Sequence, residues 1–280
     1  MDAKLIPGFE ERFAEAKGSR LRYLLGGSAE APPIVLVHGL GGAAANWIEL
    51  APLLARRHRV LVPELPGHGL STPLPAVPNL GVFADRIGLL AEREGMLPAG
   101  VVGHSLGGVV ALRLALRRPD DVTALVLAAG AGISSTTRRA KYGLRILGLI
   151  GPRRMIAPWS ASVAASTVLR YFVFGRWGAS DPLILSAAAV DGFLEGTLLA
   201  SDSTGAARAL VLDDVRQDLR GCRCRCLVLW GARDNQLPLA DGFDFARRLR
   251  AQLRVIADCG HLLIGERPDL CAEAIESFLG

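Results

Sequence analysis

The chain has 280 residues, 50% of them hydrophobic, and a formal net charge of +5; it is long enough for one domain with a large core and an inserted subdomain. Its basic residues are scattered in pairs without interleaved aromatic residues, so no nucleic-acid partner is expected. The sequence shows no signal peptide and no uncharged apolar run of roughly 18 residues, so we expect a cytoplasmic protein without an integral membrane segment.

Strands and helices are predicted to alternate along the chain. The predicted strands are 21–25, 34–38, 60–63, 101–103, 124–128, 226–230 and 253–257, and the main predicted helices are 82–94, 106–117, 240–249 and 270–279. Several of the strands are continuous runs of Val, Leu and Ile, which is typical of parallel strands covered on both faces. The sequence therefore predicts an α/β fold with a mostly parallel central sheet and helices on both faces.

The alternation stops between residues 132 and 221, where amphipathic helical patches occur at 144–150, 162–172 and 183–199 without a clear strand. We predict a core domain formed by residues 1–131 and 222–280, with 132–221 as a helical insertion. Residues 131–180 hold eight Lys or Arg and no Asp or Glu. They form either a cationic lip that attracts anionic groups or a solvated face that the acidic remainder of the insertion neutralises.

A serine lies between the predicted strand 101–103 and the helix 106–117, in the sequence Gly103-His104-Ser105-Leu106-Gly107. A serine hydroxyl becomes a useful nucleophile only when it is held exposed beside a base and beside donors for the developing oxyanion. A tight strand-to-helix turn exposes it, and glycines two residues away on either side permit that turn. Ser105 is the predicted nucleophile.

The base and its orienting carboxylate are predicted from their positions after strands. His261 lies in a loop after the strand 253–257, and Asp234 follows the strand 226–230. Both loops leave the carboxyl edge of the sheet, where ligands of open α/β folds bind. Asp258 competes with Asp234 but is close in sequence to His261 and more suited to capping its own loop. We therefore predict the set Ser105, His261 and Asp234.

Two backbone N–H groups are predicted to form the oxyanion hole. The N–H of Leu106 follows the nucleophile directly, and that of Leu40 lies in the glycine-rich loop 38–42 after a strand. This loop is not a phosphate cradle, because neither G-x-G-x-x-G nor a P-loop lysine is present.

Three of the five cysteines alternate, at positions 222, 224 and 226. Their spacing is not the paired C-x-x-C of zinc sites, and no second cluster completes a tetrahedron, so no metal site and no cofactor are predicted. A further cysteine, Cys259, is two residues from His261, and we expect it to make the protein sensitive to thiol reagents.

Taken together, these motifs resemble the α/β-hydrolase superfamily over nearly the whole chain. The matching pieces are the loop 38–42 with Asn46-Trp47, the stretch 66–71, Gly103 to Gly108, Gly231 to Asp234, and Gly260-His261, with the chain order Ser, Asp, His. The resemblance implies that 132–221 is a helical cap over the active site. One departure is Glu64, where relatives usually carry Asp; that carboxylate is expected to be structural.

The resemblance and the serine nucleophile favour a carboxylic-ester or lactone hydrolase that acts on apolar small molecules. Family members that are haloalkane dehalogenases or epoxide hydrolases carry an aspartate in place of Ser105. Two alternatives stay open: a C–C bond hydrolase acting on vinylogous diketo acids, and a ligand-binding homologue with low turnover. Aromatic residues of the cap, with Trp159, Phe172 and Trp177 foremost, are predicted to line an apolar pocket. The oligomeric state is left open.

Overall fold

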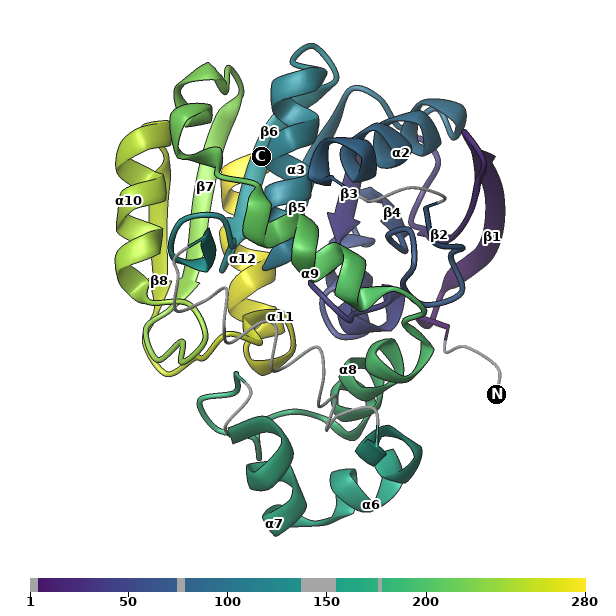
Figure 1. The fold of residues 1–280 in the computed structure, drawn as a ribbon, viewed down its shortest axis with the longest axis vertical. Coiled ribbons are helices and arrows are strands. Elements are labelled where there is room, and N and C mark those ends of the chain that lie inside the picture. The colour runs from purple at the N-terminus through teal and green to yellow at the C-terminus, as the bar shows by residue number, and fades with distance from the viewer. Residues whose placement is uncertain (1–4, 75–78, 137–154, 176–177) are drawn as a thin grey trace.

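A computed structural model describes residues 5–74, 79–136, 155–175 and 178–280. Its eight strands form one sheet in the order β1-β2-β4-β3-β5-β6-β7-β8, drawn in Figure 1. The strands are β1 (Phe9–Ala16), β2 (Ser19–Gly26), β3 (Pro33–Val37), β4 (Arg59–Pro63), β5 (Ala99–His104), β6 (Val122–Ala128), β7 (Arg225–Gly231) and β8 (Gln252–Ile256). Only the pairs β1–β2 and β2–β4 are antiparallel. The predicted α/β fold class is confirmed.

The helices of the described residues lie between and around these strands. They are α1 (Ala51–Leu54), α2 (Leu80–Arg93), α3 (Leu106–Arg117), α6 (Ser160–Ala165), α7 (Thr167–Arg170), α8 (Ala187–Leu199), α9 (Ser203–Leu212), α10 (Leu239–Leu249), α11 (Leu263–Glu266) and α12 (Pro268–Leu279). In Figure 1, α3 lies in front of the sheet and α12 behind it. Every residue of β5 is buried between these layers, which explains its continuous apolar sequence.

All seven predicted strands are present, but the sequence analysis missed β1. This strand carries three glutamates and an arginine, and its buried residues are Phe9, Ala14 and Ala16. It pairs with β2 only, at the edge of the sheet. An edge strand with one covered face does not need the continuous apolar run by which the central strands were recognised.

The segment between β6 and β7 contains helices and no strand among its described residues. Figure 1 shows α6, α7 and α8 below the sheet, whereas α9 crosses in front of it. The patch predicted at 144–150 lies outside the described residues. The domain division at residues 132 and 221 stays a prediction.

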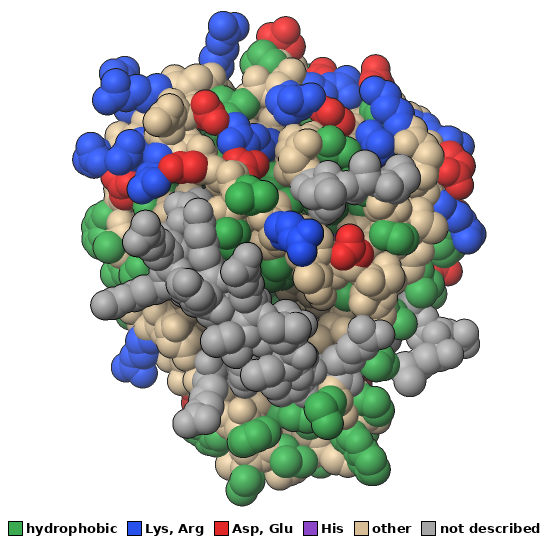
Figure 2. All heavy atoms as spheres, in the orientation of Figure 1, with side chains coloured by type: hydrophobic (Ala, Val, Ile, Leu, Met, Phe, Trp, Pro, Cys, Tyr) green, Lys and Arg blue, Asp and Glu red, His purple; other side chains and the backbone are tan. Residues whose placement is uncertain are grey.

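Within the described parts of the chain, none of the helices is both long and apolar enough to cross a membrane. Below the sheet, the described residues that precede α8 expose several large apolar side chains: Met155, Trp159, Val168, Tyr171, Phe172 and Leu183. Figure 2 shows hydrophobic side chains gathered at this end of the molecule, while most charged groups surround the sheet domain.

Candidate active site

Ser105 stands on a strained turn between β5 and α3. Its φ of 55° and ψ of −119° are values that a residue with a side chain rarely adopts. The surrounding chain holds this conformation, since Ser105 N–H donates to Ala128 O at 3.1 Å and Ser105 O accepts from Gly108 N–H and Ala131 N–H at 2.9 and 3.0 Å. The turn therefore presents the Ser105 hydroxyl beyond the carboxyl end of the parallel strands.

Glycines around this turn are required by close backbone contacts. A Cβ atom on Gly103 would lie 2.2 Å from Gly107 O, and one on Gly107 would lie 2.2 Å from Val37 O. Both distances are far below van der Waals contact between a methyl carbon and a carbonyl oxygen. The spacing of the two glycines around Ser105 thus follows from how tightly α3 packs against β3 and β5.

His261 connects Ser105 to Asp234. The His261 Nε2 atom lies 3.0 Å from Ser105 Oγ, and Nδ1 lies 2.8 Å from Asp234 Oδ2. The other carboxylate oxygen of Asp234 accepts N–H bonds from Gln236 and Leu237 at 2.8 and 2.9 Å. Because a carboxylate only accepts hydrogen bonds, Nδ1 carries the imidazole proton and the Nε2 lone pair faces the serine hydroxyl. This arrangement can take a proton from Ser105.

The loop that carries His261 is held by a buried carboxylate, that of Glu266. Glu266 accepts from Gly260 N–H at 3.1 Å and from Ser180 N–H at 2.7 Å. Burial raises the pKa of Glu266, and these N–H donors oppose that rise. The His261 N–H also donates to Gly178 O at 2.5 Å. The histidine loop is therefore joined directly to the segment between β6 and β7.

A second histidine, His104, supports the backbone of His261. Burial lowers the pKa of His104 to about 3, so its ring is neutral, and its Nε2 lies 2.9 Å from His261 O, which accepts its proton. The two rings stack at a tilt, with centroids 5.0 Å apart. A neutral His104 adds no positive charge beside His261.

The loop after β3 approaches Ser105 from the other side. A Cβ atom on Gly39 would lie 3.1 Å from Ser105 Cβ, so this loop is in close contact with the turn between β5 and α3. No hydrogen bond found within the described residues uses the N–H of Leu40 or of Leu106. Both N–H groups are thus free to donate to a ligand, as the predicted oxyanion hole requires.

His38 fixes the start of this loop. Its Nε2 accepts from Leu65 N–H at 3.0 Å, so Nδ1 bears the proton and donates to Gly39 O at 2.8 Å. The side chain is fully buried, and burial lowers its pKa to about 3. A neutral imidazole with one donor and one acceptor satisfies both backbone groups at once.

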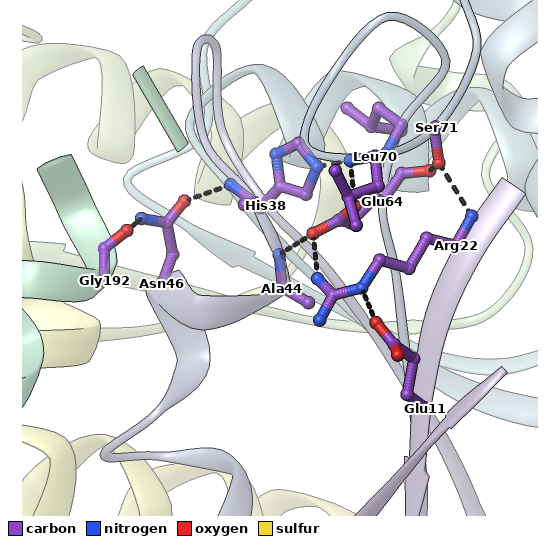
Figure 3. A network of polar contacts seen from close by, with 11 residues as sticks. Glu11, Arg22, His38, Ala44, Asn46, Glu64, Leu70, Ser71 and Gly192 are labelled. Carbon is purple, nitrogen blue, oxygen red and sulfur yellow. Dashed lines mark hydrogen bonds and ion pairs between the residues drawn. The ribbon is translucent and has the colours of Figure 1, made fainter. Parts of the chain in front are cut away.

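Glu64 is the centre of the polar network in Figure 3. Its side chain is fully buried, and it accepts from Arg22 Nη1 at 2.6 Å, Ala44 N–H at 3.2 Å and Leu70 N–H at 2.7 Å. Arg22, also fully buried, donates from Nε to Glu11 at 2.6 Å. Two buried charges are stable only when paired and hydrogen bonded in this way. The network joins β1 and β2 to the loops beside Ser105, in keeping with the structural role expected for Glu64.

Asn46 links the same loop to α8. Its Oδ1 accepts from Ala43 N–H at 2.9 Å, and its Nδ2 donates to Gly192 O at 3.2 Å, as Figure 3 shows. Gly192 has no room for a side chain, because a Cβ atom would lie 2.3 Å from Ala45 O. A Cβ atom on Gly196 of the same helix would lie 2.5 Å from Gly42 C, so α8 is packed directly on the backbone of the loop that carries Leu40.

Of the three aromatic residues predicted to line a pocket, two are largely exposed and the third lies outside the described residues. Trp159 is 66% exposed and Phe172 is 59% exposed, and Trp177 lies outside the described residues. Among the described residues between β6 and β7, the buried aromatic residues are Phe174 and Phe193. Their rings meet edge to face, with centroids 6.5 Å apart. Substrate binding by Trp159, Phe172 and Trp177 stays a prediction.

The expected sensitivity of Cys259 to thiol reagents is wrong. The side chain is fully buried, and burial raises the pKa of its thiol, which keeps it protonated. Proximity in sequence to His261 does not make it accessible, because Cys259 points into the core.

Sequence reasoning missed three supports of the site: Glu266, the Arg22–Glu64 pair and the role of His38. Only Glu266 carried a local signal, an acidic residue in the apolar stretch 262–266. Arg22 and Glu64 are 42 residues apart, and no periodicity pairs them.

Comparison with known proteins gives one family and several relatives. The family model described as the alpha/beta hydrolase family matches residues 34–274. The chain is 35% identical to a pimeloyl-(acyl-carrier protein) methyl ester esterase from Aromatoleum aromaticum, over 89% of this chain and 98% of that protein. It is 30% identical to a 2-hydroxymuconate semialdehyde hydrolase from Pseudomonas sp. strain CF600, over 88% of this chain and 86% of that protein.

Among solved structures, a hydrolase from Pseudomonas aeruginosa PA01 superimposes with a TM-score of 0.78 at 26% identity. The superposition covers 96% of this chain and 98% of that chain. The likeness therefore extends over nearly the whole length of both chains.

Proposed function

The chain belongs to the alpha/beta hydrolase family, and from that membership we propose that it is a serine hydrolase of carboxylic esters or lactones with apolar acyl or alcohol groups. One observation carries the proposal: His261 is hydrogen bonded both to Asp234, at 2.8 Å, and to Ser105, at 3.0 Å, and Ser105 stands on a strained turn. A structural serine does not require this arrangement.

In the first step, Ser105 Oγ attacks the carbonyl carbon of the ester while His261 Nε2 takes the hydroxyl proton. Asp234 holds the Nδ1–H tautomer and stabilises the imidazolium that forms. The electron pair of the carbonyl moves to its oxygen, which the N–H groups of Leu40 and Leu106 are proposed to bind. One such donor is worth roughly 3 to 4 kcal/mol in the transition state.

The tetrahedral intermediate then collapses. Its C–O bond to the alcohol breaks, His261 gives the proton to the leaving oxygen, and an acyl ester of Ser105 remains. A water molecule, deprotonated by His261, attacks this acyl group and releases the acid and the free serine. Each step uses only these side chains, two backbone N–H groups and water.

The proposed ester hydrolysis is supported by the 35% identity to a methyl ester esterase. A C–C bond hydrolase is the second candidate, because the chain is 30% identical to a 2-hydroxymuconate semialdehyde hydrolase. A C–C hydrolase needs a cation for the substrate carboxylate. The basic residues that suggested one lie mostly outside the described residues. Arg170, which is described, already donates to the carbonyl oxygens of Ala164 and Leu185 at 2.8 and 2.6 Å.

The test is a rapid-mixing assay with p-nitrophenyl esters of graded acyl chain length. We expect a burst of about one p-nitrophenol per chain in the wild type. In Ser105→Ala the burst should vanish and kcat should fall by roughly 1,000-fold or more, because the nucleophile is gone. Ser277→Ala, an exposed position on α12, is the matched control and should behave like the wild type.

Near-normal ester hydrolysis by Ser105→Ala would overturn the mechanism. Absence of a burst and of turnover with every ester in the wild type would instead reject the ester reading. Cleavage of a vinylogous diketo acid by that same protein, again dependent on Ser105, would then establish the C–C alternative.

A further inference from the structure

Three thiol groups meet at the end of the sheet that lies away from Ser105. Cys222 follows the short 3₁₀ helix η6 (Leu219–Gly221), and Cys226 is the second residue of β7. The Cys222 Sγ lies 3.5 Å from Cys224 Sγ and 3.6 Å from Cys226 Sγ, and all three sulfurs lie within 4.8 Å of one another. The alternating cysteines thus form one cluster, the Cys222–Cys224–Cys226 cluster.

The backbone explains why the sulfurs converge. Side chains two residues apart point to the same side of an extended chain, although their Cα atoms are about 6.6 Å apart. Here the chain bends at Cys224 before β7 begins, and the bend brings the three side chains together. Arg223 and Arg225, between the cysteines, are exposed.

These distances are close to those of a metal–thiolate site. Three sulfurs around one metal at a bond length of about 2.3 Å are separated by roughly 3.8 to 4.0 Å. The two separations from Cys222 Sγ, 3.5 and 3.6 Å, differ from that value by only tenths of an ångström. The sequence analysis excluded zinc because no fourth ligand completes a tetrahedron, but a soft cation such as Cu(I) is selected by thiolates and does not require tetrahedral coordination.

We propose that the Cys222–Cys224–Cys226 cluster binds a soft, thiophilic metal cation through three thiolates. The cluster is accessible, because Cys222 and Cys224 are half-buried and only Cys226 is buried. Among the described residues, no carboxylate forms a hydrogen bond or ion pair with these sulfurs. The ligand set is therefore all sulfur.

Metal binding by the cluster is coupled to proton release, because each thiol that becomes a ligand gives up its proton. Arg223 and Arg225 alternate with the cysteines, and the Arg225 guanidinium donates to Leu279 O at 2.7 Å.

The cluster and the proposed active site are independent. Cys226 and Gly231 are at opposite ends of β7, roughly 17 Å apart at 3.3 Å per residue, and Asp234 follows Gly231. Failure of metal binding therefore leaves the ester hydrolase proposal untouched, and the reverse also holds.

The experiment titrates fully reduced, reductant-free protein with Cu(I) under anaerobic conditions, in competition with a chromogenic Cu(I) chelator. We expect one Cu(I) per chain. Each of Cys222→Ser, Cys224→Ser and Cys226→Ser should weaken binding by more than about 100-fold, because losing a ligand costs more than losing one of its hydrogen-bond partners. Cys271→Ala removes a buried cysteine outside the cluster and should bind Cu(I) as the wild type does. Circular dichroism confirms that each variant is folded.

Two results overturn the proposal. One is a reduced wild type that takes no Cu(I) from the chelator. The other is tight binding that survives in all three serine variants. Whether the wild type takes Cu(I) from the chelator is decided without any variant, so the proposal stays testable even if a serine variant does not fold.

Discussion

Asp234 and Asp258 are both candidates from the sequence to orient His261, and in the structure the imidazole contacts only Asp234 of these two. The Asp234 side chain is fully buried and contacts His261 Nδ1 at 2.8 Å. Asp258 is 64% exposed and forms an ion pair with Arg233 at 2.8 Å instead. A buried carboxylate that accepts two backbone N–H bonds has little freedom, so it fixes both the tautomer and the orientation of the ring.

Asp234→Asn should therefore inactivate the protein without unfolding it. The amide can still contact His261, but it favours the tautomer in which Nδ1 accepts, and Nε2 then cannot take the Ser105 proton. We expect acylation to slow by on the order of 10⁴-fold, measured as the burst rate with a p-nitrophenyl ester. Asp258→Asn is the control, with an expected change of less than about twofold because its ion pair is on the surface. Equal losses in both variants would refute this assignment of the carboxylate.

The three residues proposed to carry the chemistry were easier to nominate from the sequence than the residues that hold them in place. Ser105, Asp234 and His261 each follow a strand, and parallel strands bring such positions to one edge, so order along the chain was enough to nominate them. His38 looks in the sequence like a further candidate base. Its role as a bridge between Leu65 N–H and Gly39 O depends on contacts 27 residues apart and on complete burial. Neither the long-range contact nor the burial of His38 can be read from the residues around it in the sequence.

Among the elements, the turn between β5 and α3 has the least tolerance for change. A Cβ on Gly107 would meet two backbone carbonyls, Val37 O at 2.2 Å and His38 O at 2.4 Å. Both belong to the end of β3, where Val37 is paired with β5, so neither can move away without disrupting the sheet. The same contact sets the distance between the loop 38–42 and Ser105.

Gly107→Ala should consequently destabilise the fold by about 3 kcal/mol or more, at the upper end of overpacking costs. It should also lower kcat, because α3 and the Leu106 N–H must shift. Gly221→Ala is the matched control: its new Cβ would meet only the flexible end of Leu116, at 3.3 Å. We expect that control to change stability by less than about 0.5 kcal/mol. Urea unfolding measures both, and a Gly107→Ala protein as stable as the control would contradict the packing argument.

The central strands were predictable from their sequences, but the edge strand β1 was not. The strands β3 to β7 are buried by layers on both faces, so their sequences are continuous apolar runs. In β1, Phe9 is buried because its ring covers Gly26, a contact with another strand that the sequence of β1 does not reveal. Between β6 and β7, the helical patch at 183–199 was predicted and corresponds to α8, but its placement was not, because contacts such as Asn46 with Gly192 orient it.

At the scale of the whole molecule, the fold buries histidines without charging them. His38, His68 and His104 are fully or almost fully buried, and burial lowers the pKa of each; for His38 and His104 it falls to about 3. An unfolded histidine binds a proton below about pH 6.5. Between pH 6.5 and about 3 the unfolded chain therefore binds more protons than the folded one. These histidines stabilise the fold fully above pH 6.5 and lose that contribution as the pH falls.

Buried acids act in the opposite direction. Burial raises the pKa of Glu64 and Glu266 above 4.5, so the folded state binds their protons more readily than the unfolded state does. Their effect on the free energy of unfolding therefore partly cancels that of the histidines just above pH 4.5. A single pH profile of the wild type mixes the two, and only a variant that removes one histidine separates them.

His38→Gln provides that separation, because a glutamine amide can donate to Gly39 O and accept from Leu65 N–H without titrating. Each neutral buried histidine adds at most about 1.4 kcal/mol per pH unit to the slope of the free energy of unfolding. Measured by urea unfolding between pH 7 and 5, the variant should be less stable than the wild type at pH 7. It should lose about 1 to 2 kcal/mol less on acidification, since most of this interval lies below the unfolded pKa. Parallel profiles for the two proteins would mean that His38 takes up a proton in the folded state as readily as in the unfolded state, which would contradict its role as acceptor from Leu65 N–H.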